Sequence, residues 1–429
     1  MSKFQLILLV VFGAFVVIAV LLFSVSKGSS GSNAVATVVV WGDIPTYDFN
    51  NLLNNVALNN GPVRIQYVEK SQATFSTDFT EALALGKGPD LVILPLSKIY
   101  KERNKLLLIP NTTVNPKDFS QTFVEEGELF LTPEGTYALP LSVDPLVLYW
   151  NRDLFTNASL VAPPKYWDEI YGFAEKLSMK DSADNLKQSA IALGEAKNIV
   201  NSKDILTLLM LEAGTPITSS NGVDLHSELS SNFNLPTVPA ESALDFYTQF
   251  SNPAKPFYSW NRSLLDSGTA FTSGTLAMYI GFASELPLLK AKNPNLNLSI
   301  TAVPQSRVSG KVITFGRLKG VAIVKNTKNQ PAALNAALLL VSKDISSALS
   351  TITGLPSARR ELLNTKPKGF ADSVFFDSAI KSKGFVDPDD VKTGKIFTKM
   401  IESVTSGKSR ITEAVREASN EIDQIISTK

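Results

Sequence analysis

The sequence predicts an α/β protein with two domains, preceded by one N-terminal transmembrane helix. Three observations lead to this prediction. Strand-like and helix-like segments alternate over residues 34–94, the chain of 429 residues is too long for one hydrophobic core, and an uncharged apolar run stands near its start. A strand, helix, strand, helix, strand order predicts a largely parallel sheet with right-handed crossover connections.

The apolar run extends from Leu6 to Phe23 without a charged or polar side chain. As a helix it would be about 27 Å long, close to the ~30 Å hydrocarbon core of a bilayer. We therefore expect residues 1–27 to be an uncleaved membrane anchor, with a cleaved signal segment as the alternative. Lys3 favours an N-terminus that stays inside, so the rest of the chain would lie outside a cell membrane that it crosses once.

Residues 28–35 are rich in Ser and Gly and predict a flexible linker. The chain has no cysteine, which excludes disulfides, a cysteine nucleophile and the lipid-modified cysteine of many exported proteins. Its 41 basic and 40 acidic side chains nearly balance, so there is no basic field for nucleic acid.

The predicted sheet begins with strands over 34–41, 63–68 and 90–94, separated by helices around Phe49–Val56 and Phe75–Leu83. Ligands of such sheets bind at the carboxyl ends of the strands, which places Trp41–Asp43 and Leu94–Ser97 on one rim. Further strands are expected at 137–141, 146–149, 190–193, 277–280, 299–303 and 320–324, and further helices at 167–177, 203–213, 240–250, 332–342 and 409–427.

Four local patterns occur in a fixed order along the chain. They are Gly86-Lys87-Gly88-Pro89-Asp90, Thr132–Pro140 continuing to Phe155, Pro163–Ile170, and Phe271–Gly274 followed by Ala277-Met278, with a weaker fifth at Gly354–Arg360. In this order the sequence resembles the type 1, maltodextrin-type extracellular solute-binding proteins of ABC importers. Each pattern also has a local role; Gly274, for example, supplies a chain reversal before a strand.

The resemblance implies a two-lobed periplasmic-binding-protein-like (type II) fold with hinge strands. One lobe would comprise 36–141 plus 304–342, and the other 142–303 plus 343–429. The crossings would lie near Pro140–Asp144 and Val303–Pro304. A cleft between the lobes would close on the ligand by a hinge motion.

By the same resemblance, Asp144 and Asp43 lie where relatives place polar groups for sugar hydroxyls, which a carboxylate accepts well. Trp41, Tyr137 and Trp260 are candidate rings for the apolar faces of sugars. Phe282 and Glu285 stand where relatives have an aromatic platform, and Leu94 also replaces a ring, so maltodextrin itself is in doubt. The candidate ligand-binding residues are Trp41, Asp43, Ser97, Tyr137, Asp144, Trp260, Phe282 and Glu285.

We expect the protein to capture a small polar solute, which the resemblance suggests is a saccharide, and to deliver it to ABC permease subunits. We expect it to act as a monomer without a cofactor or a metal. A membrane-tethered sensor on the same fold is one alternative. An exported glycoside hydrolase is another, but no motif among the 40 acidic residues nominates a catalytic carboxylate pair. A Ser-His hydrolase or a zinc protease is disfavoured because His226 is the single histidine and no G-x-S-x-G or H-E-x-x-H motif occurs. Asp387-Pro388-Asp389-Asp390 resembles a calcium cluster, yet it predicts a helix start with an Asp N-cap and Pro first in the helix.

Overall fold

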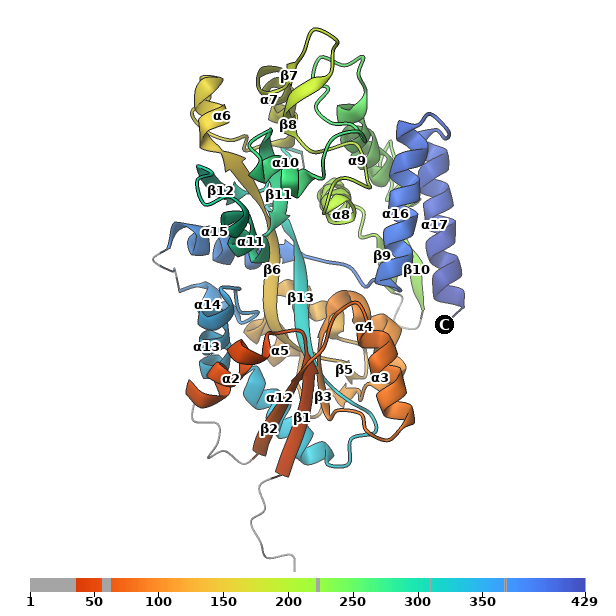
Figure 1. The fold of residues 1–429 in the computed structure, drawn as a ribbon. Coiled ribbons are helices and arrows are strands. Elements are labelled where there is room, and N and C mark those ends of the chain that lie inside the picture. Colours follow the sequence, from red (N-terminus) through yellow and green to blue (C-terminus); the bar gives the residue numbers. More distant parts are fainter. Residues whose placement is uncertain are drawn as a thin grey trace, which may run out of the picture.

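The structure is a computed structural model, and it describes residues 36–55, 63–220, 224–308, 310–365, 367 and 369–428. Two lobes lie one above the other and are joined by two long strands (Figure 1). The expected anchor (1–27) and linker (28–35) lie outside the described residues. Within them, no single helix has the length and apolar composition of a membrane span, and only the pair α12 (Gln330–Leu340) and α13 (Lys343–Thr353), bent by 60°, passes both criteria together.

The first lobe contains the predicted parallel sheet. Strands β1 (Ala36–Gly42), β2 (Val63–Glu69) and β3 (Leu91–Pro95) lie in the order β2-β1-β3, and both pairs are parallel. Helices α2 (Thr46–Asn55) and α3 (Phe75–Ala84) make the crossovers. Phe49, Phe75 and Phe79 are buried in this lobe because helical spacing places them on the faces that meet the sheet.

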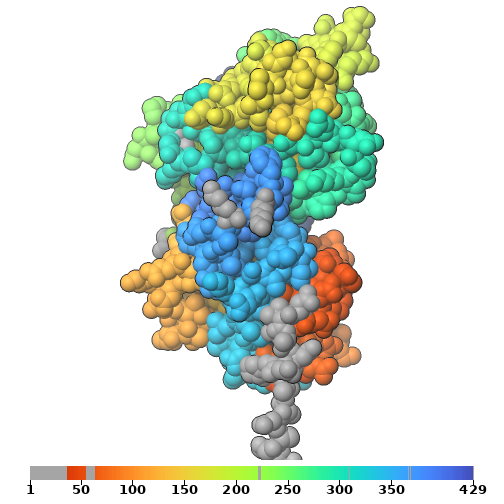
Figure 2. Space-filling model, turned by 90° about the vertical axis from the view of Figure 1, so that its left-hand side faces the viewer, coloured from red at the N-terminus to blue at the C-terminus, as the bar shows by residue number. Residues whose placement is uncertain are grey.

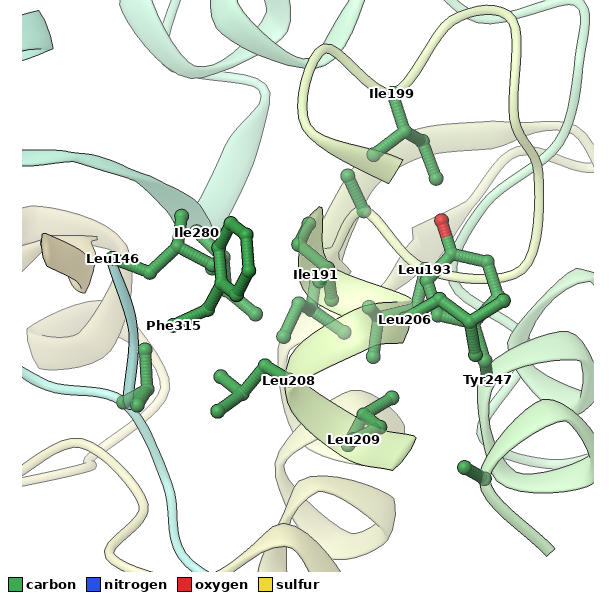
Figure 3. Packing of buried hydrophobic residues seen from close by; sticks show 14 of the residues in the cluster. Leu146, Ile191, Leu193, Ile199, Leu206, Leu208, Leu209, Tyr247, Ile280 and Phe315 are labelled. Carbon is green, nitrogen blue, oxygen red and sulfur yellow. The ribbon is translucent and has the colours of Figure 1, made fainter. Parts of the chain in front are cut away.

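The second lobe has its own core (Figure 3). Strand β11 (Leu276–Phe282) is buried along its whole length between β8 (Leu186–Ile191) and β6 (Leu139–Asn151). Helix α8 (Ser202–Ala213) contributes Leu206, Leu208 and Leu209 to the same core, opposite Ile191 and Ile280. The two cores are separate clusters of buried side chains, as expected for a chain of this length.

Two long strands connect the cores. Strand β6 and strand β13 (Thr314–Ile323) are antiparallel neighbours in one continuous sheet, ordered β2-β1-β3-β13-β6-β11-β8-β7. On β6, Val143 belongs to the first core and Leu146 to the second; on β13, Phe315 belongs to the second core and Leu318 to the first. The chain therefore passes between the lobes at Asp144–Pro145 and again at Gly316–Arg317.

The division into lobes differs from the expected one in two places. Residues 305–313 stay with the second lobe, because the Gln305 N–H donates to Lys165 O (2.9 Å) and Ile313 lies in the second core. The second crossing consequently falls at Gly316–Arg317, thirteen residues (316 minus 303) after the expected Val303–Pro304. Residues 343–363, which include helix α13, were expected in the second lobe, but Ile345, Leu349 and Leu363 are buried in the first core.

The remaining elements complete both lobes. They are α4 (Leu96–Glu102), β4 (Ile109–Pro110), α5 (Pro116–Thr122), β5 (Gly135–Thr136), α6 (Arg152–Asn157), α7 (Ile170–Leu177), β7 (Met179–Lys180), β9 (Thr218–Ser220), β10 (Leu225–Ser227), α9 (Pro239–Thr248), α10 (Ser267–Thr272), α11 (Leu286–Lys292), β12 (Leu298–Ala302), α14 (Arg360–Leu363), α15 (Phe370–Ala379), β14 (Ser382–Lys383), α16 (Asp390–Thr405) and α17 (Ile411–Ser427). On one side of the molecule, the segment that contains α13 to α15 runs from the first lobe to the second (Figure 2).

The structure tests two of the local predictions made from the sequence motifs. Gly274 has a positive φ of 77° and β11 begins two residues later, which confirms the predicted chain reversal. The helix start at Asp387–Asp390 is also present, but its N-cap is Asp389, whose carboxylate accepts from the Lys392 N–H (3.3 Å), and not Asp387. Asp387 instead binds Lys203 and Thr393. Among the described residues, no group of three or more acidic or histidine side chains could hold a metal ion.

Candidate functional site

Two cations of the crossing strand β13 each pair with a carboxylate of a different lobe. Arg317 and Lys319 alternate with the buried Leu318, so both side chains leave the same face of the strand. Lys319 Nζ lies 2.6 Å from Asp43 Oδ2, just after β1 in the first lobe. Arg317 Nη2 lies 2.6 Å from Asp204 Oδ2, in the first turn of α8 in the second lobe. One strand therefore presents a polar group to each lobe at the place where they meet.

Asp144 lies beside these pairs on the other crossing strand. It is the register partner of Arg317 and is only 7 % exposed. Its Oδ1 accepts a hydrogen bond from the Ser284 N–H (2.9 Å). Burial raises the pKa of Asp144, while the bond from Ser284 and the charges of Arg317 and Lys319 oppose that rise. The structure thus brings Asp43 and Asp144, two of the sequence-predicted residues, to the same place.

A cavity of about 760 Å³ opens on the second lobe next to the Arg317–Asp204 pair. It lies between the start of α8 and helix α16, and in Figure 1 these helices stand above α4 on one side of the crossing strands. No described residue of its lining is aromatic; the lining includes Val200, Lys203, Asp204, Val391, Lys395 and Lys399. Its walls can make hydrogen bonds and ionic contacts but offer no ring for stacking.

The lobes also meet at the start of α16. Lys101 of α4 lies 3.1 Å from Asp389, the N-cap of α16. Within the second lobe, Lys203 Nζ contacts Asp387 Oδ2 (2.5 Å) and Thr393 Oγ1 (2.7 Å), which ties α8 to the same segment. These ion pairs fix the N-terminal end of α16 beside the cavity.

A second cavity of about 910 Å³ is lined by both lobes and contains the predicted residue Tyr137. In the first lobe its lining comes from α4 and the segment around Phe130; in the second it comes from Leu225 of β10 and Ile426 near the end of α17. Tyr137 is half-buried there. The described lining of this cavity does not include Asp43 or Asp144.

The predicted aromatic surfaces are covered. Trp260 is 1 % exposed in the second core, and its Nε1 donates to Asn198 Oδ1 (3.1 Å). This differs from the expectation of a ring that faces the cleft, because the loop before Trp260 folds inward. Phe282 is fully buried, and the guanidinium of Arg317 lies 3.6 Å from its ring centroid. Neither ring gives a ligand a face in this structure.

The other predicted residues have separate surroundings. Trp41 is 8 % exposed, and Lys70 Nζ lies 4.2 Å above its ring. The carboxylate of Glu285 already has hydrogen-bond partners within the second lobe. It accepts hydrogen bonds from Tyr279 Oη, from Asn201 Nδ2 (2.8 Å) and from the Phe282 N–H (2.9 Å). Ser97 is half-buried in α4, on the rim expected from the sheet topology. His226, expected in a surface loop, lies on strand β10, where its side chain is 47 % exposed.

The sequence reasoning missed Asp204, Arg317 and Lys319. A usable signal was present in β13, where Arg317 and Lys319 alternate with Leu318 and are followed by the apolar Val321–Ile323. Charges at every second position of an apolar strand indicate one polar face. Asp204 gave no such signal, because an acidic residue in the first turn of a helix is common for electrostatic reasons alone.

Comparison with known proteins places the chain among binding proteins. Residues 52–374 match the family described as bacterial extracellular solute-binding protein. The galactooligosaccharide-binding protein of Bacillus subtilis (strain 168) is 23 % identical over 325 residues, which cover 74 % of this chain and 72 % of that protein.

Two solved structures have the same fold. A cyclo/maltodextrin-binding protein complexed with maltotetraose superimposes with a TM-score of 0.74 at 18 % identity, covering 91 % of this chain and 97 % of that one. A cyclic α-maltosyl-1,6-maltose binding protein from Arthrobacter globiformis gives a TM-score of 0.73 at 15 % identity, covering 92 % of this chain and all of that one. These similarities confirm the predicted periplasmic-binding-protein fold.

Proposed function

Because the chain belongs to the bacterial extracellular solute-binding proteins, which are non-enzymatic components of ABC import, we propose that it captures a saccharide between its two lobes and delivers it to an ABC permease. The observation that supports this proposal is the group formed by Asp43, Asp144 and Asp204 with Arg317 and Lys319. Carboxylates accept hydrogen bonds from sugar hydroxyls, and the two cations donate to hydroxyl and ring oxygens.

The placement of this group suits a ligand that holds the lobes together. Asp43 belongs to the first lobe, Asp204 to the second, and the two cations to the strand between them. A ligand that contacts all three elements interacts with more groups when the lobes approach. It therefore stabilises the closed arrangement by its differential affinity.

The proposal includes the position of the protein at the membrane. Residues 1–27 would anchor the chain in the cell membrane by a single span, and residues 28–35 would let the two lobes reach the permease. Such an anchor would replace a lipid attached to cysteine, which this chain lacks. Fractionation of cells that express the full chain tests this part, because a cleaved signal segment would release a shortened soluble protein.

Thermal-shift and calorimetric titration of the full-length protein with saccharides tests the central proposal. A specific ligand at about 100 times its Kd should raise the free energy of unfolding by about 2.7 kcal/mol. Maltotriose, mannobiose, galactobiose and their longer homologues form the panel, with glycerophosphodiesters and polyols beside them. Recovery of the unchanged ligand is expected; absence of binding by every saccharide, or consumption of one, contradicts the proposal.

A further inference from the structure

The ring of Phe282 and the guanidinium of Arg317 form a closed stack at the end of β11. Phe282 has no exposed surface, and its ring packs at 6.4 Å from that of Phe315, at an angle of 67°. The Arg317 guanidinium carbon lies 3.6 Å from the centroid of Phe282. A cation at this distance is attracted by the face of the ring. The Arg317 guanidinium therefore covers one face of the Phe282 ring.

Asp204 fixes Arg317 in this position. Its Oδ2 lies 2.6 Å from Arg317 Nη2, and its side chain is largely buried in the first turn of α8. The Arg317 side chain remains 47 % exposed, so it is covered by Phe282 and Asp204 on one side and open on another. Within the described residues, Asp204 Oδ1 accepts no hydrogen bond from the protein and the Nε and Nη1 groups of Arg317 donate none.

The pair therefore offers an acceptor and donors side by side at the edge of the 760 Å³ cavity. Two neighbouring hydroxyl groups of a sugar match this arrangement, since one can donate to Asp204 while the other accepts from Arg317. A planar guanidinium that is already held by a carboxylate loses little conformational freedom when it binds.

Resting on the function proposed above, we propose that Arg317 and Asp204 form a recognition pair for two adjacent hydroxyls of the saccharide, and that Arg317 replaces an aromatic stacking surface in this protein. The expected ligand is therefore a saccharide that the protein recognises by hydrogen bonds to the hydroxyls at the edge of a sugar ring. The absence of any aromatic side chain among the described lining residues of the adjacent cavity agrees with this mode of binding.

Arg317→Met in the full-length protein tests the proposal. The methionine keeps an apolar side chain over Phe282 but removes the donors. For the panel saccharide that binds the wild-type protein most tightly, we expect at least a tenfold rise in Kd by calorimetry. Arg307→Met is the matched control, because Arg307 also lies over a ring (Tyr166, 3.7 Å) and pairs with a carboxylate (Asp168, 2.9 Å) and is half-exposed. The Kd of the Arg307→Met protein for the same saccharide should change less than twofold.

Monodeoxy forms of the same saccharide separate hydroxyl recognition from a general disturbance. Loss of one of the recognised hydroxyls should weaken binding to the wild-type protein at least tenfold but have little further effect on the Arg317→Met protein, a coupling that only a direct or adjacent contact produces. An unchanged Kd in Arg317→Met, or equal losses in both proteins, overturns the recognition pair while leaving saccharide binding intact. If the wild-type protein binds no saccharide of the panel, the proposed function fails, and the pair fails with it.

Discussion

Lys101 and Asp389 form an ion pair of 3.1 Å that joins the two lobes directly. Lys101 belongs to α4 in the first lobe, and Asp389 is the N-cap of α16 in the second. The Asp389 side chain is only 5 % exposed, so water screens the pair weakly on that side. The relative position of the lobes therefore depends on this contact as well as on the two crossing strands.

We expect Lys101→Met to loosen the lobes, because it removes the ionic contact that Lys101 makes with a nearly buried carboxylate of the other lobe, at a cost of about 1–3 kcal/mol. The chain has no cysteine, so spin labels can be attached specifically after Leu85→Cys and Val161→Cys, two exposed positions in different lobes. The distribution of distances between the labels should become broader and longer. Lys343→Met, which removes an exposed pair with Glu361 inside the first lobe, is the control. Equal distributions in both variants would show that the pair does not hold the lobes.

Asp144→Asn tests the role of the carboxylate on β6. Asparagine preserves the shape and an oxygen acceptor for the Ser284 N–H, so the unliganded melting temperature should change little. The charge beside Arg317 is lost, and a charge-assisted hydrogen bond to a sugar hydroxyl becomes a neutral one, which should raise Kd about tenfold. Calorimetric titration and a melting curve measure the two effects. A large loss of stability with an unchanged Kd would assign Asp144 a purely structural role.

Glu126 should make the stability of the protein depend on pH. It is 1 % exposed near the crossing, accepts from the Ser382 hydroxyl (2.6 Å), and burial raises its pKa to about 8. A carboxyl with a raised folded-state pKa binds more protons in the folded than in the unfolded chain between its two pKa values. The stabilisation that protonated Glu126 adds to the free energy of unfolding is therefore complete below about pH 4.5. It is lost as the pH rises towards about 8.

Thermal melts of Glu126→Gln and wild-type protein between pH 5 and 9 measure this effect. The variant should show a flatter decline, since glutamine has no proton to lose. Glu212→Gln is a comparison in the second lobe, because burial also raises the pKa of Glu212 to about 8 beside Trp167. An unchanged pH profile after Glu126→Gln would contradict the assignment.

Trp260→Phe separates a core residue from a ligand-binding one. The substitution removes the hydrogen bond to Asn198 and leaves unfilled volume in the second core, so the free energy of unfolding should fall by about 1–3 kcal/mol. Because the ring of Trp260 is buried, Kd for the saccharide should stay within twofold. Denaturant titration and calorimetry give the two values. A weakened Kd without loss of stability would show that Trp260 contacts the ligand.

The sequence by itself determined the α/β class, the parallel sheet of the first lobe and the family. These follow from local information: β-branched strands, helical faces such as that of Phe75 and Phe79, and turns at positions such as Gly274 depend on residues close in the chain. The rim at the carboxyl ends of β1 and β3 also follows from strand order alone. Asp43 was predicted for this reason and because of the family resemblance, and Asp144 was predicted from the resemblance alone.

Only the tertiary structure decided which side chains meet there. Arg317 and Asp204 are more than a hundred positions apart, and their contact depends on where β13 crosses between the lobes, which no local pattern specifies. The same holds for Phe282 and Trp260. An aromatic residue after a strand or in a loop can face solvent or a core, and packing against distant residues such as Arg317 and Asn198 decides between them.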